Sequence, residues 1–324
     1  MTWIDGLLIV DKPEGITSMG VVREVKRRCS IKKVGHIGTL DPFATGVLPV
    51  VLNEGTKVVP FLEEEPKEYE ATLKFGEETT TDDCTGEVVS RRPWEGILPE
   101  TIHGAFQAFS GRIQQIPPMF SAVKVQGQPL YRLARKGIEI ERKERDVTIF
   151  ELNISRILLP EVTFRVSCSK GTYIRTLARD LGKHIGCGAH LVRLRRVRSG
   201  PFSLDRSISW EKLQSLSGRD ELGPWVITLK EALKKLPEVI GNERSVRKVR
   251  VGQEMVVRDL SSEGLPAFEK GACVQMTSTE GGLVAILRSV IGDTDVTTVH
   301  PDTVAFRPLR VFRSEDRIQN EGYA

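Results

Sequence analysis

The stretch VTFRVSCSKGTYIRTLARDLG, residues 162 to 182, joins a strand pattern to a helix pattern through a turn. In its first half apolar residues alternate with polar ones, at Val162, Phe164, Val166 and Cys168. After Lys170-Gly171 apolar residues recur at helical spacing, at Ile174, Leu177, Ala178 and Leu181. The stretch therefore predicts a half-buried strand, a turn and an amphipathic helix.

The same two patterns recur elsewhere along the chain. GLLIVDKP, residues 6 to 13, predicts a short buried strand that ends at Pro13. Thr17 or Ser18 can cap a helix that follows, and its apolar face consists of Val21, Val22, Val25 and Cys29. YEATLKF, residues 69 to 75, again alternates like a strand. Because strands and helices interleave without a regular βαβ period, we expect a mixed α+β sheet and not a doubly wound one.

The length of 324 residues and the composition indicate two domains. We expect a first domain at 1–237, in which 115–145 form a mobile excursion rich in turns and charges. A helical stretch at 210–240 leads to a boundary near Pro237. Beyond it the apolar pieces VRVGQEMVV, GACVQMTS and GGLVAILRSV predict a small β-barrel at 238–312, and 313–324 are expected to be disordered.

Several classes of protein are disfavoured by the composition. With 40% hydrophobic and 28% charged residues, and no run of eighteen apolar residues, we expect a soluble chain without a membrane span. The N-terminus lacks the basic start and cleavage site of a signal peptide, which predicts a cytoplasmic protein. Five singly placed cysteines and five histidines without HxH or HxxxH spacing argue against a disulfide framework and a zinc site.

The positive charge is unevenly distributed. The net charge is +4 and the sequence pI is about 8.8. Basic residues concentrate in the segments 132–145 (RLARKGIEIERKER), 193–198 (RLRRVR) and 244–250 (RSVRKVR). One such cluster can be a solvated helix face, but three together favour a polyanionic partner, with phosphate contacts as their usual role.

The stretch GHIGTLDPFATGVLPV, residues 35 to 50, predicts a loop rich in glycine and proline. Three glycines within twelve residues allow backbone conformations that other residues avoid. Pro42 restricts Asp41 to extended or turn geometry and so fixes the direction of its carboxylate. From the residues alone, Asp41 is either a turn former or a catalytic carboxylate.

The sequence GHIGTLDPFATGVLP resembles the catalytic motif of the TruB family of pseudouridine synthases, in which the Asp of GTLDP is the essential residue. Further stretches resemble motifs of this family, namely KPEGITS (12–18), KEY (67–69), PPMFSAVKVQGQPLYRLARKG (117–137), SKGTYIRTLARDLG (169–182) and LRRVRSGPF (194–202). The resemblance covers nearly all of residues 6 to 210. Residues from about 240 to 312 are similar, less distinctively, to a PUA domain.

The resemblance implies both a fold and a reaction. The expected fold is α+β, with a mixed, mainly antiparallel catalytic sheet, an RNA-contacting insertion at 115–145 and a small PUA-like β-barrel. The expected activity is isomerisation of uridine 55 in the T loop of tRNA to pseudouridine. The base must leave the RNA stack before it can react. We expect a monomer that needs no protein partner.

The resemblance also assigns roles to individual residues. Asp41 is the catalytic carboxylate, Arg175 pairs with it and favours its charged form, and Tyr69 stacks on the target uracil near the final proton transfer. His36 fills the space that the extruded base leaves. Further binding residues are Lys12, Lys67, Lys124, Tyr173 and Leu194. The pair of acidic residues in DDCTG, residues 82 to 86, is better explained as turn chemistry than as a metal site.

The chemistry is compatible with a chain that shows no cofactor motif. Uridine loses its C1′–N1 bond, turns within the pocket and rejoins through C5, without net redox change. We therefore expect no cofactor and no metal. Asp41 can attack the base, attack the sugar, or remove a sugar proton to start an elimination, and the sequence leaves these routes open.

Three alternatives remain. A guide-RNA-dependent pseudouridine synthase shares the catalytic motifs, but the insertion at 115–145 favours stand-alone recognition. A non-catalytic RNA-binding or tRNA-folding protein would not need intact Asp41, Tyr69 and Arg175. A glycosidase with paired carboxylates needs sugar-stacking aromatics, and only 6% of the residues are aromatic.

Overall fold

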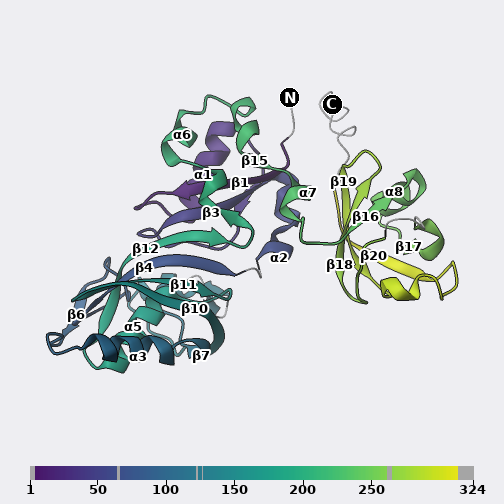
Figure 1. Cartoon of the computed structure of the whole chain (residues 1–324). Coiled ribbons are helices and arrows are strands. Elements are labelled where there is room, and N and C mark those ends of the chain that lie inside the picture. Colours follow the sequence, from purple (N-terminus) through teal and green to yellow (C-terminus); the bar gives the residue numbers. More distant parts are fainter. Residues whose placement is uncertain (1–3, 64–65, 122, 126, 261–264, 313–324) are drawn as a thin grey trace.

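The computed structural model describes residues 4–63, 66–121, 123–125, 127–260 and 265–312. An eleven-stranded sheet carries the larger part of the chain, and a five-stranded sheet forms a separate C-terminal part (Figure 1). The strands of the large sheet are β1 (Gly6–Lys12), β2 (Val34–His36), β3 (Thr45–Leu52), β4 (Lys67–Phe75), β7 (Gly111–Gln115), β10 (Arg145–Leu158), β11 (Glu161–Cys168), β12 (Ala189–Ser199), β13 (Phe202–Ser203), β14 (Ser207–Ile208) and β15 (Val226–Ile227).

The large sheet is mixed and mainly antiparallel. Its main path runs β14-β1-β3-β12-β4-β11-β10-β7, and within it only β1–β14 and β12–β3 pair in parallel. Strands far apart in sequence are therefore neighbours, and β12 brings Arg195 and Arg196 beside Thr45 and Gly46 of β3. The α+β fold class is confirmed.

Helices cover both faces of this sheet and the C-terminal part. They are α1 (Ser18–Cys29), α2 (Val59–Leu62), α3 (Pro99–Ala108), α4 (Leu130–Ala134), α5 (Ile174–Ile185), α6 (Trp210–Ser215), α7 (Leu229–Ala232) and α8 (Glu243–Arg250). Helices α3 and α5 lie together under one end of the large sheet (Figure 1). Among the described residues, no helix is both long enough and apolar enough to cross a membrane.

Alternation along β1 divides its side chains between two cores. Leu8 and Val10 belong to a core shared with α1, α3 and α5. Leu7 and Ile9 point to the opposite face and pack in a second core with α2, α7 and the C-terminal part. All four side chains are 0% exposed, so both faces of β1 are buried.

The elements expected from periodicity are confirmed at several places. Strand β1 ends at the residue before Pro13, and Thr17 caps α1 by accepting the Gly20 N–H at 2.9 Å. Strands β4 and β11 and helix α5 also follow the expected patterns. Each of these elements buries the apolar face that the sequence indicated.

Three sequence-based assignments are wrong in part. Residues 35–50 are not one loop, because β2 and β3 occupy both ends and only 37–44 connect them. The run GVLPVVL lies in β3, which is buried on both faces and therefore lacks an alternating pattern. The helical stretch at 210–240 is divided into α6 and α7 by a segment that contains Gly218, Gly223 and Pro224.

The C-terminal part also differs from expectation. Its sheet has the order β16-β18-β19-β20-β17, with β16 (Glu238–Gly241), β17 (Met255–Val256), β18 (Cys273–Ser278), β19 (Leu283–Ser289) and β20 (Val304–Val311). The stretch VRVGQEMVV was expected to be a strand, but its first residues end α8 and only Met255–Val256 are extended. The sheet curls into a small PUA-like fold (Figure 1). The expected disorder of 313–324 lies outside the described residues.

Two short hairpins lie outside these sheets. Strands β5 (Glu77–Thr79) and β6 (Val88–Arg91) flank the DDCTG turn. The expected insertion contains β8 (Lys124–Val125), β9 (Gln128–Pro129) and α4. Its mobility stays a prediction.

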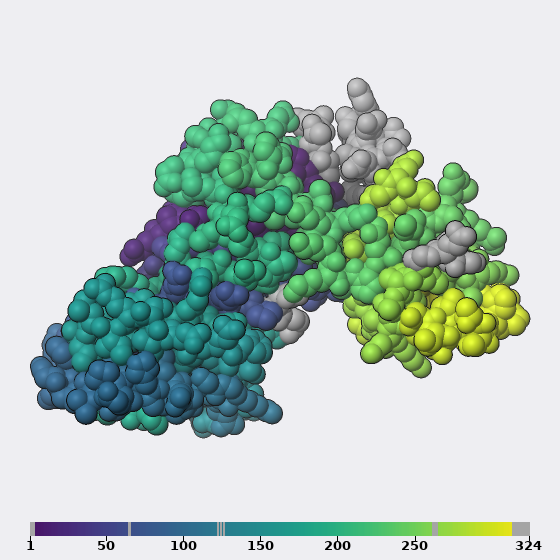
Figure 2. All heavy atoms as spheres, in the orientation of Figure 1, coloured from purple at the N-terminus to yellow at the C-terminus, as the bar shows by residue number. Residues whose placement is uncertain are grey.

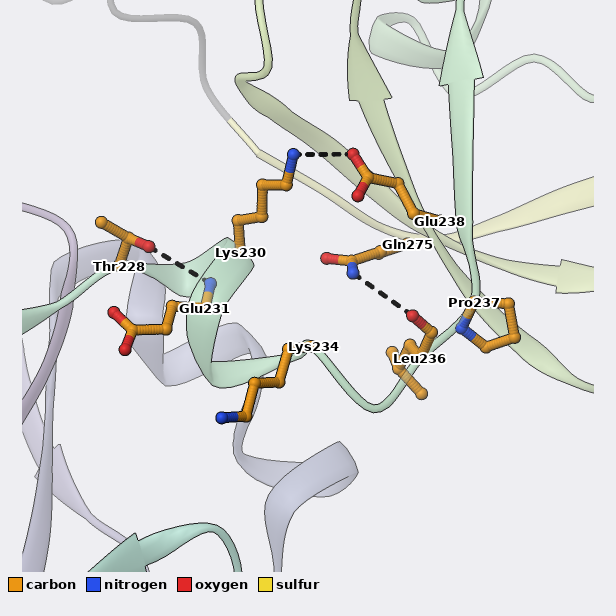
Figure 3. A pocket seen from close by; sticks show the side chains of 8 residues that line it. All are labelled: Thr228, Lys230, Glu231, Lys234, Leu236, Pro237, Glu238 and Gln275. Atoms are coloured by element: carbon orange, nitrogen blue, oxygen red, sulfur yellow. Dashed lines mark hydrogen bonds and ion pairs between the residues drawn. The ribbon is translucent and has the colours of Figure 1, made fainter. Parts of the chain in front are cut away.

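The C-terminal part meets the rest of the protein beside α7 (Figure 2). Ile286 and Phe312 are buried in the second core, and Lys57 Nζ donates to the Val311 carbonyl oxygen at 2.7 Å. A cavity of about 530 Å³ opens at this junction, where Lys230 pairs with Glu238 at 2.7 Å (Figure 3). None of the expected site residues lines it, so the reaction chemistry has to be sought elsewhere.

Candidate active site

The loop 37–44 holds Asp41 through the main chain of its two neighbours. Before it, Leu40 donates its N–H to Ser18 Oγ at 2.8 Å, and the Ser18 hydroxyl donates to the Leu40 carbonyl oxygen at 2.9 Å. After it, the Gly15 N–H donates to the Pro42 carbonyl oxygen at 2.8 Å. Ser18 is buried, so these bonds form where water does not compete. The direction of the Asp41 side chain is thus set from both sides.

Lys12 is a second anchor of the loop and is fully buried. Its ammonium group donates to the carbonyl oxygens of Pro13, Ile16 and Pro42 at 2.8, 2.7 and 3.1 Å. Burial lowers the pKa of Lys12 to about 8, and the nearby Asp41 opposes this shift. The expected role of Lys12 in holding the site is therefore consistent with its contacts.

The guanidinium group of Arg175 binds the Asp41 carboxylate with two nitrogens. Nε lies 2.9 Å from Oδ2, and Nη2 donates to Oδ1 at 3.2 Å. Arg175 also donates to the carbonyl oxygens of Thr81 and Phe120, each at 2.9 Å. The Arg175 side chain is 4% exposed, whereas 32% of the Asp41 side chain is accessible. A buried cation thus presents a carboxylate that solvent or substrate can reach.

The pKa of Asp41 lies above its ordinary value of 3.8. Protein atoms surround the carboxyl group on most sides, and this burial raises the pKa more than Arg175 lowers it. Asp83 adds to the rise, and Lys12 opposes it. A carboxylate of raised pKa is a stronger base or nucleophile once it is ionised.

Asp83 is a site residue that the sequence did not reveal. The DDCTG segment does form a turn, as expected, but the Asp83 side chain points inward and is 5% exposed. Its Oδ2 lies 3.4 Å from Arg175 Nη1. Its Oδ1 accepts hydrogen bonds from the Thr81 hydroxyl and from the N–H and hydroxyl of Thr85. Arg175 therefore contacts two carboxylates, one accessible and one buried.

Tyr69 and Arg196 lie side by side on β4 and β12. Tyr69 is 8% exposed, and burial raises the pKa of its phenol while Arg196 opposes the rise. Arg196 is 1% exposed and donates to the carbonyl oxygens of Val47 at 2.7 Å and Gly38 at 3.0 Å. Arg196 therefore braces the start of the Asp41 loop.

The burial of Arg196 removes this residue from the predicted phosphate-binding cluster RLRRVR, while the role of the other arginines stays a prediction. Because a strand points successive side chains to opposite faces, a basic run on β12 cannot face solvent throughout. Arg196 is the inward member. The other three arginines each contact an acidic side chain, in the pairs Arg193–Glu161, Arg195–Asp11 and Arg198–Glu68.

Tyr173 and Leu194 are expected from the resemblance to line the pocket, and this role stays a prediction. Tyr173 precedes α5, and Gln115 binds both its main-chain N–H at 3.0 Å and its carbonyl oxygen at 3.2 Å. Burial raises the pKa of the Tyr173 phenol, and Asp41 is among the charges that act on it. Leu194 is 7% exposed and pairs with Ala71 of β4. Gln115 was not expected from the sequence.

His36 and Lys67 occupy the ends of strands next to the loop. Burial, with a contribution from Arg196, lowers the pKa of His36, so the ring is neutral at neutral pH. Its Nδ1 is buried and has no hydrogen-bond partner among the described residues. Lys67 starts β4, two residues before Tyr69, and its ammonium group donates to the Glu63 carbonyl oxygen at 2.5 Å.

In the described part of the chain, no three or more His, Cys, Asp or Glu side chains are grouped so that they could hold a metal ion. The five cysteines are free thiols. Lys124 is also expected to contribute to binding, but its side chain is not among those that the structure describes.

Comparisons with known proteins agree with this geometry. A family model described as TruB family pseudouridylate synthase (N terminal domain) matches residues 26–174, and one described as tRNA pseudouridylate synthase B C-terminal domain matches 175–235. A protein of Geobacter sulfurreducens named tRNA pseudouridine synthase B is 44% identical over 312 residues, covering 95% of this chain and 100% of that protein. The chain belongs to the TruB family of pseudouridylate synthases.

Other TruB-family relatives and solved structures extend the similarity over nearly the whole chain. A protein of the same name from Syntrophus aciditrophicus is 43% identical over 95% of this chain and 99% of its own length. A solved H/ACA RNP bound to a substrate RNA containing 2′-deoxyuridine has a chain with a TM-score of 0.73 and 26% identity, covering 96% of this chain and 86% of that chain. An archaeal box H/ACA sRNP Nop10-Cbf5 complex gives a TM-score of 0.72.

Proposed function

We propose that this protein isomerises uridine 55 in the T loop of tRNA to pseudouridine, with the Asp41 carboxylate as the catalytic group. The observation that carries the proposal is the accessible Asp41 carboxylate held by two nitrogens of the buried Arg175. The Geobacter and Syntrophus relatives, which match nearly the whole chain, are named tRNA pseudouridine synthase B. The name supports tRNA as the substrate, and the geometry supports Asp41 as the catalytic carboxylate.

The reaction begins with the uridine outside the RNA stack, because Asp41 cannot reach a base inside it. The ionised carboxylate attacks the base or the sugar, or removes a sugar proton, and the C1′–N1 bond breaks. The uracil turns in the pocket and bonds to C1′ through C5, and any bond that Asp41 has formed breaks again. C5 then loses its proton, and N1, which kept the electron pair of the broken C1′–N1 bond, takes one up. Atoms and electrons balance without any other reactant.

Each neighbouring residue has a role in this scheme. Arg175 fixes the carboxylate and favours its ionised form, which partly offsets the effect of burial. Tyr69 stacks on the uracil and lies near the final proton transfer. Tyr173 and Leu194 line the pocket, and Lys12 and Lys67 hold the main chain around it. His36 is neutral, so its ring can replace a base in the stack without bringing a charge into it.

We also propose different roles for different parts of the chain. Residues 1–237 form the catalytic domain, and the insertion at 115–145 contacts the T arm. The curled sheet at 238–312 forms an RNA-binding domain, on which α8 carries a basic cluster. Its Lys248 is bound by Asp259 at 2.7 Å, whereas Arg247 keeps most of its side chain exposed. We further propose that the protein acts in the cytoplasm as a monomer without an obligatory protein partner.

A guide-dependent activity is the second candidate, because the similar solved structures come from H/ACA particles. The two functions differ in what must be added to the reaction. A short stem-loop copied from the T arm should be converted at its single target uridine by the purified protein alone. An unstructured strand with the same loop sequence should react far more slowly, since recognition is by shape.

Pseudouridine can be mapped by carbodiimide treatment of the product RNA. The Asp41→Asn variant controls for contaminating synthases. If the stem-loop stays unmodified until a guide RNA or a second protein is added, the guide-dependent function is correct. If both oligonucleotides react equally well, the protein does not recognise the fold of the T arm.

A further inference from the structure

Helix α5 presents two arginines to the same turn. Arg175 and Arg179 are one helical turn apart and therefore lie on the same side of α5. Arg175 Nη1 lies 3.4 Å from Asp83 Oδ2, and Arg179 Nη1 donates to Asp82 Oδ2 at 3.1 Å. Consecutive carboxylates of one turn thus meet successive guanidinium groups of one helix.

The turn is also held by main-chain hydrogen bonds to β12. Leu191 of β12 donates its N–H to the Asp82 carbonyl oxygen at 3.0 Å, and Cys84 donates its N–H to the Leu191 carbonyl oxygen at 2.9 Å. Asp82 adopts a left-handed backbone conformation with φ of 60°, which orients its side chain toward α5. Because main-chain bonds hold the turn, the Arg179–Asp82 contact acts mainly through charge.

The Arg179–Asp82 contact divides four carboxylates between the two arginines. Arg175 faces the carboxylates of Asp41 and Asp83. Arg179 faces Asp82 and also Asp180, which accepts from its Nε and Nη2 at 3.0 and 2.9 Å. Without Arg179, the Asp82 carboxylate would be left beside Arg175 and would compete with Asp41 for it.

We propose that Arg179, acting through Asp82, is a positioning residue for the Arg175–Asp41 pair. It neutralises Asp82 so that Arg175 stays directed at Asp41 and Asp83. That this pair is catalytic rests on the proposed function. The effect of Arg179 on the ionisation of Asp41 does not depend on it.

The charges that act on the pKa of Asp82 agree with this role. Burial raises the pKa of Asp82, Arg179 and Arg175 oppose the rise, and Asp180 and Asp83 reinforce it. The side chains of Asp82 and Arg179 are 14% and 26% exposed, so solvent screens their pairing only in part. The charged groups that face Asp41 itself are Arg175, Asp83 and Lys12.

The test uses four variants that change the local charge in a known sense. Relative to the unchanged protein, Arg179→Gln makes the local net charge more negative by one, Asp82→Asn makes it more positive by one, and the double variant restores the original net charge. Lys183→Gln removes the same charge from the exposed next turn of α5 and is the matched control. Single-turnover rates on the T-arm stem-loop are measured from pH 5 to pH 9, together with RNA affinity and Tm.

We expect Arg179→Gln to move the acid limb of the rate profile upward by about 0.5 to 1 pH unit, which slows the reaction about three- to tenfold at pH values on that limb, with RNA affinity unchanged. Asp82→Asn should move the limb downward. The double variant should return it to the position of the unchanged protein, and Lys183→Gln should not move it. A loss of Tm in Arg179→Gln without any shift of the limb would show a merely structural role and overturn the proposal.

A second readout is independent of turnover. The ¹³C resonance of the Asp41 carboxyl group, titrated in the RNA-free protein, should shift its midpoint in the same order across the variants. If the unchanged protein does not convert the stem-loop, the proposed function fails while this titration still decides the role of Arg179. If the unchanged protein is active and neither midpoint nor acid limb responds to Arg179→Gln, the inference is wrong.

Discussion

The ammonium group of Lys12 donates a hydrogen bond to the carbonyl oxygen of Pro42, the residue that directly follows Asp41. Lys12 ends β1, and Pro42 belongs to the loop between β2 and β3. The same ammonium group bonds Pro13 and Ile16, so one buried cation links the end of a strand to the loop of the carboxylate. The charge state of Lys12 should therefore affect the reaction.

We predict that the rate falls as the pH rises through about 8, the pKa of Lys12. Below this pH the ammonium has three N–H donors for three carbonyl oxygens, and above it the neutral amine has only two. Lys12→Met should lower the single-turnover rate by on the order of 10²-fold, because a displaced loop misplaces the carboxylate. Lys26→Met, on the exposed face of α1, is the control and should leave the profile unchanged. An alkaline limb that persists in Lys12→Met would have to be assigned to another group.

Asp41→Asn should abolish turnover while leaving RNA affinity nearly intact. The amide has the shape of the carboxylate but cannot serve as nucleophile or base. In the unchanged protein, activity should be lost as the pH falls through the raised pKa of Asp41, at a higher pH than the 3.8 of an ordinary Asp. Single-turnover rates against pH measure both effects, with the exposed Asp205→Asn as control. A rate about a tenth of normal in Asp41→Asn would contradict the role of Asp41.

Arg175→Ala should destabilise the protein as well as inactivate it. The change leaves the buried Asp83 and the partly buried Asp41 without their shared cation, which typically costs about 3–5 kcal/mol. Arg165→Ala removes an arginine whose pair with Glu70 is more than half exposed on both sides, and should cost less than about 1 kcal/mol. Urea unfolding monitored by fluorescence compares the two. Similar free energies of unfolding for both variants would show that the Arg175 pairs are not coupled to stability.

Arg196→Met and Arg198→Met should differ sharply although they are two residues apart. Arg196→Met removes the donor of the buried Val47 carbonyl oxygen, at about 1–3 kcal/mol, and that of the partly buried Gly38 carbonyl oxygen, at a smaller cost. Arg198 is half exposed and pairs with Glu68, so its loss should change the free energy of unfolding by less than about 1 kcal/mol. The same unfolding assay applies. Equal losses would mean that Arg196 is not an essential brace of the loop.

Much of the fold could be predicted where local patterns and burial coincide. Strands β4 and β11 and helix α5 each bury one face, and the sequence shows it as alternation or helical spacing. Strand β3 is buried on both faces and β16 is four residues long, so neither has a distinctive period. In α8 the buried Val246 and Val249 are separated by basic residues, which concealed the helix.

Site residues could be predicted only where they lie in a motif that resembles one of the TruB family. The pairing of Asp41 with Arg175 came from the family resemblance, since 134 residues separate them in the chain. Asp83 and Arg196 were missed because a turn pattern and a basic run have ordinary explanations. Arg196 meets Gly38 across 158 residues, and no local signal reports such a contact. The domain boundaries and the roles of the remaining residues stay predictions.

The loop of Asp41 is tied at Gly38, Leu40 and Pro42 to three different elements, β12, α1 and the end of β1. A loop held in this way has lost its conformational freedom during folding, before any RNA arrives. The amide hydrogen of Leu40 should accordingly exchange slowly with solvent in the RNA-free protein. The carboxylate is then preorganised, and the rearrangement that limits capture of the uridine belongs to the RNA.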